Sequence, residues 1–255
     1  MLWTILGIAV IGYGLACATL FFRQRSFLYF PTAKVDHPFE VEVFENQGET
    51  VEVIVVDEGG ERSIIYFGGN AETVAYNGIE FRDRFPGMSV YLVNYRGYAG
   101  SSGGPSEKAL FDDALHKYDK LAQRHESIVV IGRSLGSGVA TYLASMRPVE
   151  KLVLITPYDS IRAVGQSQYP IFPVGLLLKD HFDSASRVSK VGADTLVVLA
   201  DSDRVIPVDS SKRLIAAFPN DQIRVETIEN TDHNDVTDTD KYYELLSEFL
   251  IDEEL

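Results

Sequence analysis

Cysteine is almost absent from this chain of 255 residues, and basic residues are outnumbered. The single cysteine, Cys17, excludes an internal disulfide framework and a metal site built mainly from cysteines. Lysine and arginine number 23 against 37 acidic residues, which gives a formal net charge of −14. With no basic stripe, nucleic-acid binding is excluded as a main function. Internal repeats and low-complexity linkers are missing as well, and we expect one domain to account for residues 31–255.

Charged side chains are missing from residues 1–22, MLWTILGIAVIGYGLACATLFF. About 20 such residues span the hydrocarbon core of a bilayer, and the run lacks the charged start and clear cleavage site of a secretory signal. We therefore expect residues 1–22 to form a transmembrane anchor; a buried or a cleaved segment is the alternative. Arg23, Arg25 and the aromatic run 27–30 follow at once. The positive-inside rule then places the following domain on the cytoplasmic side.

Strand-like and helical patterns alternate through the rest of the chain. VEVFE and TVEVIVV alternate in polarity around a turn at NQGE and predict an antiparallel pair. Later runs are continuously apolar, as in strands buried on both faces of a parallel sheet. These runs are SIIYF (63–67), MSVYLVN (88–94), SIVVIG (127–132), KLVLIT (151–156) and TLVVLA (195–200). Helical stretches cover 71–85, 106–125, 135–146, 208–217 and 236–250. The alternation predicts a doubly wound α/β sheet.

Residues 157–183 interrupt this alternation. Pro157, Pro170 and Pro173 prevent one continuous helix there. The segment is too short for a domain of its own, so we expect a cap of short helices. Such a cap would lie over the carboxyl ends of the strands, where open α/β sheets bind their ligands.

The stretch GRSLGSG, residues 132–138, lies between an expected strand and an expected helix. A dinucleotide loop belongs at the first strand of its fold and is followed by an acidic residue at the end of the next strand. Neither feature is present, nor is the lysine of a P-loop. G-x-S-x-G instead suits a nucleophilic serine on a sharp turn, because Gly132 and Gly136 provide the small neighbours that such a turn needs. A plain packing turn is the alternative interpretation.

A nucleophilic Ser134 would need a base, an acid and two oxyanion donors. Of the two downstream histidines, His233 follows the alternating run IRVETI and is the expected base, whereas His181 lies in the cap. Three carboxylates compete for the acid position: Asp201, Asp203 and Asp159. The backbone N–H groups of Leu135, which follows the serine, and of Asn70, in the glycine loop YFGGNAE, are the expected oxyanion donors.

Together these stretches resemble the serine hydrolases of the α/β-hydrolase fold, and most closely a small, often membrane-tethered branch. That branch includes protein depalmitoylases and proteins described as serine aminopeptidase-like. The matching stretches run from residue 23 to 235: RQRSFLYFPT, YFGGNAE, NYRGYAGSSGGPSE, GRSLGSGVATYLA, DSDRVIP and DHND. The family pattern has its triad acid at the start of D-x-x-I/V-P. The stretch DRVIP matches it, so the resemblance implies that Asp203 is the triad acid. The resemblance implies an α/β-hydrolase fold with a mostly parallel sheet, an antiparallel N-terminal pair and a short helical cap.

The chain also departs from that pattern. Gly68 stands where the oxyanion loop usually has histidine, Ala200 replaces a glycine before the acid, and Thr231 with Asp232 replaces a small pair before the base. Because backbone N–H groups serve the oxyanion, we expect activity to survive. Arg96, in NYRGYAGSSGGPSE, is expected to pair with a carboxylate and to have a positioning role.

The expected function is cleavage of a carboxylester or thioester through Ser134, His233 and Asp203, with an acyl-enzyme intermediate and without a metal or organic cofactor. The substrate would be an acyl ester, a thioester or a lipid-like molecule, and model substrates with short to medium acyl chains should be accepted. Apolar cap residues would line one open wall of its site: Tyr169, Ile171, Phe172, Val174 and 176–178. A serine aminopeptidase or amidase, and a non-catalytic membrane adaptor with the same fold, are the alternatives.

Overall fold

A computed structural model describes residues 1–219 and 222–251. At its centre is an eight-stranded sheet with the order β1-β2-β4-β3-β5-β6-β7-β8. The strands are β1 (Glu40–Asn46), β2 (Glu49–Asp57), β3 (Arg62–Phe67), β4 (Ser89–Val93), β5 (Ser127–Arg133), β6 (Lys151–Ile155), β7 (Asp194–Ala200) and β8 (Ile223–Ile228). β2 pairs antiparallel with β1 and β4, and the pairs from β4 to β8 are parallel. The expected fold class is confirmed.

The N-terminal strand pair is a tight hairpin. Gln47 and Gly48 connect β1 to β2 with φ angles of 56° and 81°. Turns with positive φ at both central residues match the twist of the strands that they join. The predicted antiparallel pair is thus confirmed, and it forms one edge of the sheet.

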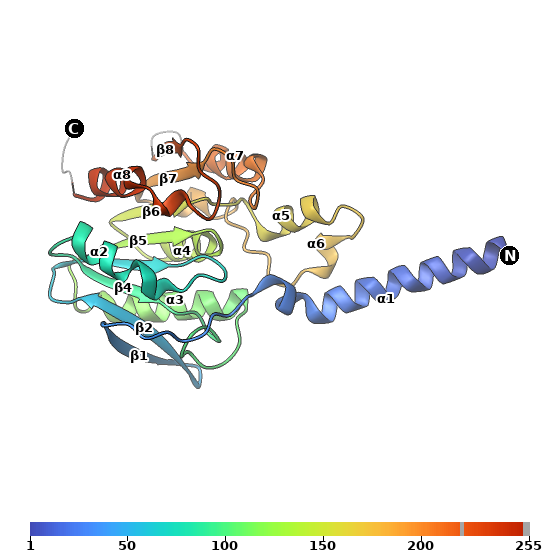
Figure 1. Ribbon diagram of the computed structural model, residues 1–255, viewed down its shortest axis with the longest axis horizontal. Helices are drawn as coiled ribbons and strands as arrows, with labels where there is room; N and C mark the ends of the chain where they lie inside the picture. The colour runs from blue at the N-terminus through green and yellow to red at the C-terminus, as the bar shows by residue number, and fades with distance from the viewer. Residues whose placement is uncertain (220–221, 252–255) are drawn as a thin grey trace.

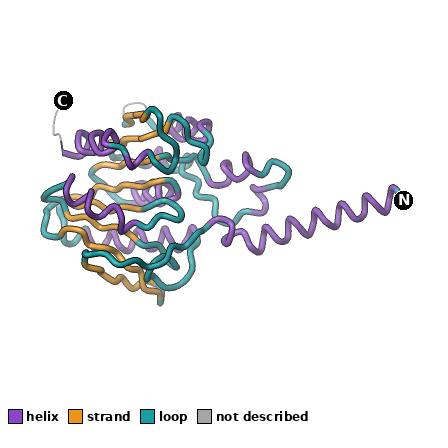
Figure 2. Tube along the Cα trace, in the orientation of Figure 1, coloured by secondary structure: helices purple, strands orange, loops and turns teal. Residues whose placement is uncertain are grey.

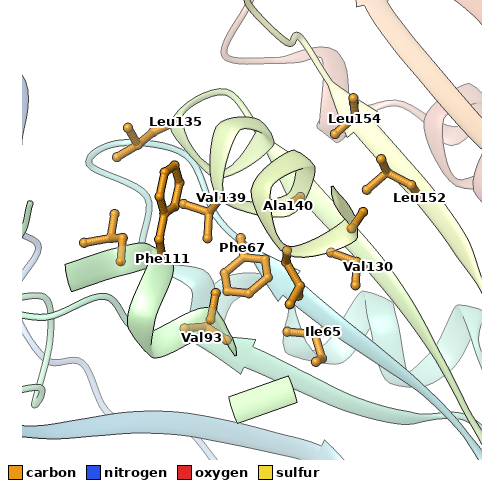
Figure 3. Packing of buried hydrophobic residues seen from close by; sticks show 14 of the residues in the cluster. Ile65, Phe67, Val93, Phe111, Val130, Leu135, Val139, Ala140, Leu152 and Leu154 are labelled. Atoms are coloured by element: carbon orange, nitrogen blue, oxygen red, sulfur yellow. The ribbon is translucent and has the colours of Figure 1, made fainter. Parts of the chain in front are cut away.

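Helices cover both faces of the sheet (Figure 1). The helices that pack on it are α2 (Gly78–Arg84), α3 (Glu107–Leu121), α4 (Leu135–Met146), α7 (Val208–Ala217) and α8 (Asp240–Ile251). Side chains alternate between the faces along each strand. Phe67 of β3 therefore packs in the cluster with α3, α4 and α7, whereas its neighbour Tyr66 packs in the cluster with α2 and α8. Figure 3 shows the first cluster, with Val139 and Ala140 of α4 directed toward Phe67 and Val130.

Two of the expected helices begin later than their patterns predict. The stretch 71–85 contains a short 3₁₀ helix, Val74–Asn77, before α2, and 236–250 contains another, Val236–Asp238, before α8. The first shift has a local cause: Ala71 has a φ of 61°, and the Glu72 backbone N–H donates to the Gly69 carbonyl. This turn cannot continue as a helix. The other three helices begin within one residue of their predicted starts.

The N-terminal helix α1 (Leu2–Leu28) extends away from the sheet, and its C-terminal end meets the domain beside the cap (Figure 1). Its 27 residues include a window of mean hydropathy 2.2 that is not buried within the chain. These properties fit membrane association. The cap consists of two short helices, α5 (Ile161–Gln168) and α6 (Val174–Leu177), with a loop between them (Figure 2). A 3₁₀ turn, Val188–Lys190, leads from the cap region to β7.

Candidate active site

Ser134 lies on the sharp turn between β5 and α4. Its φ of 49° and ψ of −115° fall in a region that residues with a side chain rarely adopt. A Cβ atom at Gly136 would lie 2.0 Å from the Phe67 carbonyl oxygen, and one at Gly132 would lie 2.4 Å from the Gly136 carbonyl oxygen. Both contacts are with backbone and are sterically impossible. The G-x-S-x-G pattern therefore reflects the close approach of α4 to two strands.

Ser134, His233 and Asp203 form a continuous hydrogen-bonded row. The His233 Nδ1 lies 2.8 Å from Asp203 Oδ2, and its Nε2 lies 2.8 Å from Ser134 Oγ. A carboxylate only accepts, so the neutral imidazole carries its proton on Nδ1 and the serine hydroxyl donates to Nε2. The ring is 5% exposed. The three residues chosen from the sequence are thus brought together at the carboxyl ends of β5 and β7 and in the loop after β8.

The competing residues are engaged elsewhere. Asp201 accepts hydrogen bonds from the backbone N–H groups of Asn230 and Thr231, at 3.0 Å each. The bond from Asn230 is the main cause that holds the pKa of Asp201 below its ordinary value. Asp159 pairs with Ser210 Oγ and with Arg213, both at 2.5 Å. Asp201 therefore holds the loop that carries His233, and Asp159 ties the cap to α7.

The loop of residues 68–70 lies against the serine. A Cβ atom built on Gly69 would lie 3.7 Å from the Ser134 Cβ atom. This places the expected donor Asn70 one residue from that contact. Leu135 is the first residue of α4, where a backbone N–H has no acceptor within its own helix. A Cβ atom at Gly68 would lie 2.5 Å from Val74 Cγ1, so a larger residue at this position would displace that side chain.

Tyrosines from the NYRGY stretch hold this loop in place. Tyr95 donates its hydroxyl to the Gly68 carbonyl, and Tyr98 donates to the Asn70 side-chain oxygen, both at 2.7 Å. The Asn70 side-chain amide in turn donates to the carbonyl of Leu28 in α1, at 2.7 Å. Arg96 of the same stretch pairs with Asp113 of α3 through two contacts of 2.7 Å, so the expected pairing with a carboxylate is confirmed.

Glu72 and Arg133 connect the loops of the site, although no motif in the sequence marks either residue. Glu72 Oε2 accepts from the Gly69 backbone N–H at 2.5 Å and lies 3.2 Å from Arg133 Nη1. Its other oxygen accepts from Tyr66 and Asn77 at 2.7 Å each. The Arg133 guanidinium donates to the carbonyls of His233 and Asn234, at 3.3 and 3.0 Å. Burial opposes the charge on Arg133, but the Glu72 carboxylate keeps the pKa of Arg133 above its ordinary value.

Within the described residues, 1–219 and 222–251, no group of three or more metal-ligating side chains is placed to hold a metal ion. His181 contributes its backbone to the cap: its N–H donates to Glu107 Oε2 at 2.7 Å, and its carbonyl accepts from Ile161.

Solved structures with the same architecture identify the fold. An esterase of Pyrococcus furiosus, Pf2001, superposes with a TM-score of 0.67 at 15% identity, over 87% of this chain and 96% of its own. A putative hydrolase of Agrobacterium vitis superposes with a TM-score of 0.66 at 16% identity, over 84% of this chain and 98% of its own. Another neighbour is described as an alpha/beta hydrolase fold protein from Chitinophaga pinensis. The chain has the α/β-hydrolase fold.

Relatives by sequence include two membrane or lipid-directed proteins. An uncharacterized protein of Mycobacterium tuberculosis is 39% identical over 58% of this chain and 54% of its own length. An uncharacterized membrane protein of Saccharomyces cerevisiae is 30% identical over 65% and 62%. The lysophosphatidylserine lipase ABHD12 of Danio rerio is 30% identical over 50% and 39%. The alignments thus span about half the length of these curated relatives. No protein-family model matches the chain.

Proposed function

We propose that this α/β-hydrolase-fold chain is a serine hydrolase that cleaves a carboxylester or thioester. The observation that carries the proposal is the row of two 2.8 Å contacts from Ser134 through His233 to Asp203, on a strained turn beside a glycine loop. An unactivated serine hydroxyl is a poor nucleophile, and this row supplies the base and the group that orients it. Relatives and structural neighbours described as a lipase and an esterase support the same chemistry.

The reaction would proceed through an acyl-enzyme. Ser134 Oγ attacks the acyl carbonyl carbon while His233 Nε2 takes the hydroxyl proton. Asp203 holds the imidazolium that forms. The backbone N–H groups of Asn70 and Leu135 donate to the oxyanion. When the intermediate collapses, the bond to the leaving alcohol or thiol breaks and His233 returns the proton to that group. Water, activated by His233, then attacks the acyl-enzyme, releases the carboxylic acid and restores Ser134.

The membrane is the proposed place of action. Residues 1–22 would anchor the chain by a single pass, with the domain on the cytoplasmic side. The exposed, apolar helix α1 and the membrane protein among the relatives support the anchor, while Arg23 and Arg25 at its end support the orientation. Retention in the membrane pellet at high salt and alkaline pH is the expected result. Release into the supernatant would contradict the anchor.

A labelling experiment tests the catalytic proposal. Full-length protein should react with a fluorophosphonate probe, and Ser134→Ala should not. A non-catalytic adaptor would leave the probe unreacted in both proteins. Parallel assays with p-nitrophenyl acyl esters, acyl thioesters and aminoacyl anilides then test the leaving group. We expect the esters or thioesters to be cleaved faster, and faster turnover of the anilides would indicate a peptidase or amidase.

A further inference from the structure

An apolar cavity of about 310 Å³ lies between α1 and the cap. Leu20, Phe27 and Leu28 of α1 line one side, and cap residues such as Ile161, Val164 and Leu177 line the other. The polar residue Gln24 also borders the cavity, but its amide group is occupied. It donates to the Leu177 carbonyl at 2.9 Å and accepts from the Lys179 backbone N–H at 2.6 Å. The helix α1 is therefore a wall of the cavity as well as a candidate anchor.

One end of this cavity is linked by a hydrogen bond to the loop that carries the proposed oxyanion donor Asn70. Leu28 lines the cavity, and its carbonyl accepts the hydrogen bond from the Asn70 side chain. Asn70 follows Gly69, which lies against Ser134. These contacts place the Leu28 end of the cavity next to the loop whose Asn70 N–H is the proposed donor to the acyl carbonyl oxygen.

The outer end lies beside the part of α1 that has no charged residues. Tyr13 donates its hydroxyl to the Ile171 carbonyl at 2.7 Å, and its ring stacks on Phe172 with 5.7 Å between centroids. Tyr13 precedes Arg23 by about ten residues, or roughly 15 Å of helix. The side chains of Ile171 and Leu176 in this tip of the cap are 72% and 83% exposed. If α1 crosses the bilayer, this apolar tip lies in the lipid alongside it.

Polar contacts join the C-terminal part of α1 to the end of the cap. Arg25 pairs with the buried Asp180 through contacts of 2.9 and 3.3 Å, and the Tyr29 hydroxyl donates to the same carboxylate at 3.2 Å. The stretch of α1 from Tyr13 to Leu20 thus has no charged residue, whereas Gln24, Arg25 and Tyr29 make polar contacts with the segment 177–180. This gradient matches the boundary between hydrocarbon and headgroups.

We propose that the cavity between α1 and the cap binds the acyl chain of a substrate that resides in the same bilayer and enters sideways from the lipid. The proposal rests on the proposed ester or thioester hydrolysis at Ser134. It names the substrate class as a membrane-resident acyl lipid or acylated molecule, and it makes α1 a determinant of chain-length specificity.

A matched pair of tryptophan variants tests the cavity. Leu20→Trp fills the cavity from α1, whereas Leu15→Trp makes the same change at a residue that is 65% exposed on the same helix and outside the cavity. The readout is the ratio of kcat/KM for p-nitrophenyl dodecanoate to that for p-nitrophenyl acetate, with full-length protein in phosphatidylcholine nanodiscs. Because each buried methylene contributes a fewfold to binding, Leu20→Trp should lower this ratio about tenfold or more. Leu15→Trp should keep the wild-type ratio.

A second pair tests entry from the lipid. Leu176→Asn introduces a polar group at the exposed tip of the cap, and Ile79→Asn does so at an exposed position of α2, on the far side of the domain from α1 (Figure 1). Leu176→Asn should slow cleavage of 4-methylumbelliferyl palmitate embedded in the nanodisc, relative to cleavage of soluble p-nitrophenyl acetate. Ile79→Asn should leave the ratio of palmitate cleavage to acetate cleavage unchanged.

The outcomes separate the two proposals. Acetate cleavage by the wild type together with an unchanged chain-length ratio in Leu20→Trp would overturn the acyl site and leave the hydrolase proposal intact. Equal behaviour of Leu176→Asn and Ile79→Asn would overturn entry from the lipid. Failure of the wild type to cleave any ester or thioester, or to react with the fluorophosphonate, would contradict the proposed function itself and the acyl site with it.

Discussion

The two sides of the candidate site are held by different forces. On one side, hydrogen bonds and an ion pair fix the row of Ser134, His233 and Asp203 and the loop that carries Asn70. On the other side, α1 and the cap enclose an apolar cavity, and their polar contacts lie along its border, as with Gln24 and Leu177, and beyond it, as with Arg25 and Asp180. Directional bonds set atomic positions closely, which a reaction needs. Apolar packing depends little on orientation and tolerates chains of different length. Variants of the hydrogen-bonded side should therefore change the reaction rate more than variants of the contacts between α1 and the cap.

The largest effect is expected at the nucleophile. Ser134→Ala removes the attacking oxygen, and in a comparable triad the loss of the nucleophile lowers kcat on the order of 10⁶-fold. Steady-state hydrolysis of p-nitrophenyl acetate measures the change, and circular dichroism provides the check on folding. Hydrolysis near the wild-type rate in a folded Ser134→Ala protein would remove this serine from the chemistry.

The two neighbouring aspartates should differ widely. Asp203→Asn disturbs the orientation of His233, and the same change in a comparable triad costs about 10⁴-fold in kcat. Asp201→Asn keeps an oxygen that can accept from the 230–231 backbone, so we expect a loss of about tenfold or less. Measurement of kcat for both variants ranks them directly, and the reverse order would assign the acid to Asp201.

The sequence predicted the parts of the molecule that rest on local constraints. Continuous apolar runs located the parallel strands β3 to β7, and the two glycines around Ser134 located a turn at which a Cβ atom would strike backbone. The sequence predicted the three residues of the row because a serine, an aspartate and a histidine each come shortly after an expected strand. The family resemblance selected Asp203 over Asp201. The catalytic roles of these residues remain predictions, as do the domain limits.

Contacts between distant polar residues could not be predicted in this way. Arg133 binds the carbonyl of Asn234, 101 positions further along the chain, and Gln24 binds that of Leu177, 153 positions away. No sequence pattern marks Glu72 or Arg133. Their contacts exist only because the fold brings three loops together, which the sequence pattern does not predict. The role of α1 as a wall of the cavity was missed for the same reason, since an uncharged helix of this length predicts only an anchor.

An intermediate effect is expected at Glu72. Glu72→Gln keeps the size of the side chain and removes the charge that faces Arg133, so the loop of Gly69 and the loop of His233 lose their link. Displacement of catalytic groups by about 1 Å can cost on the order of 100-fold, and we expect kcat to fall about 10- to 100-fold. KM should change little, because Glu72 lies outside the acyl cavity. Glu80→Gln, at the exposed surface of α2, is the matched control.

A purely structural role for Glu72 would give a different result. In that case Glu72→Gln would lower the unfolding temperature and leave kcat of the folded fraction unchanged. A double-mutant cycle with Arg133→Met sharpens the distinction, because residues that act through one ion pair show non-additive losses. Additive losses in kcat would contradict the proposed link between the two loops.

The smallest effect is expected at the ion pair between Arg25 of α1 and Asp180 at the end of the cap. Asp180→Asn weakens the pairing with Arg25, whose side chain is 54% exposed, so solvent screens most of that interaction and its contribution is about 1 kcal/mol or less. For a domain of this size such a loss lowers the unfolding temperature by about 2 to 4 °C. We expect hydrolysis of the short acetate ester to change less than in Glu72→Gln, because the carboxylate contacts neither Ser134 nor the loop that holds Asn70. Thermal unfolding and acetate kinetics, measured on Asp180→Asn and Arg25→Gln side by side, test this. A loss of acetate turnover as large as that of Glu72→Gln would show that α1 and the cap position the catalytic groups themselves, and that the two sides of the site are not mechanically separate.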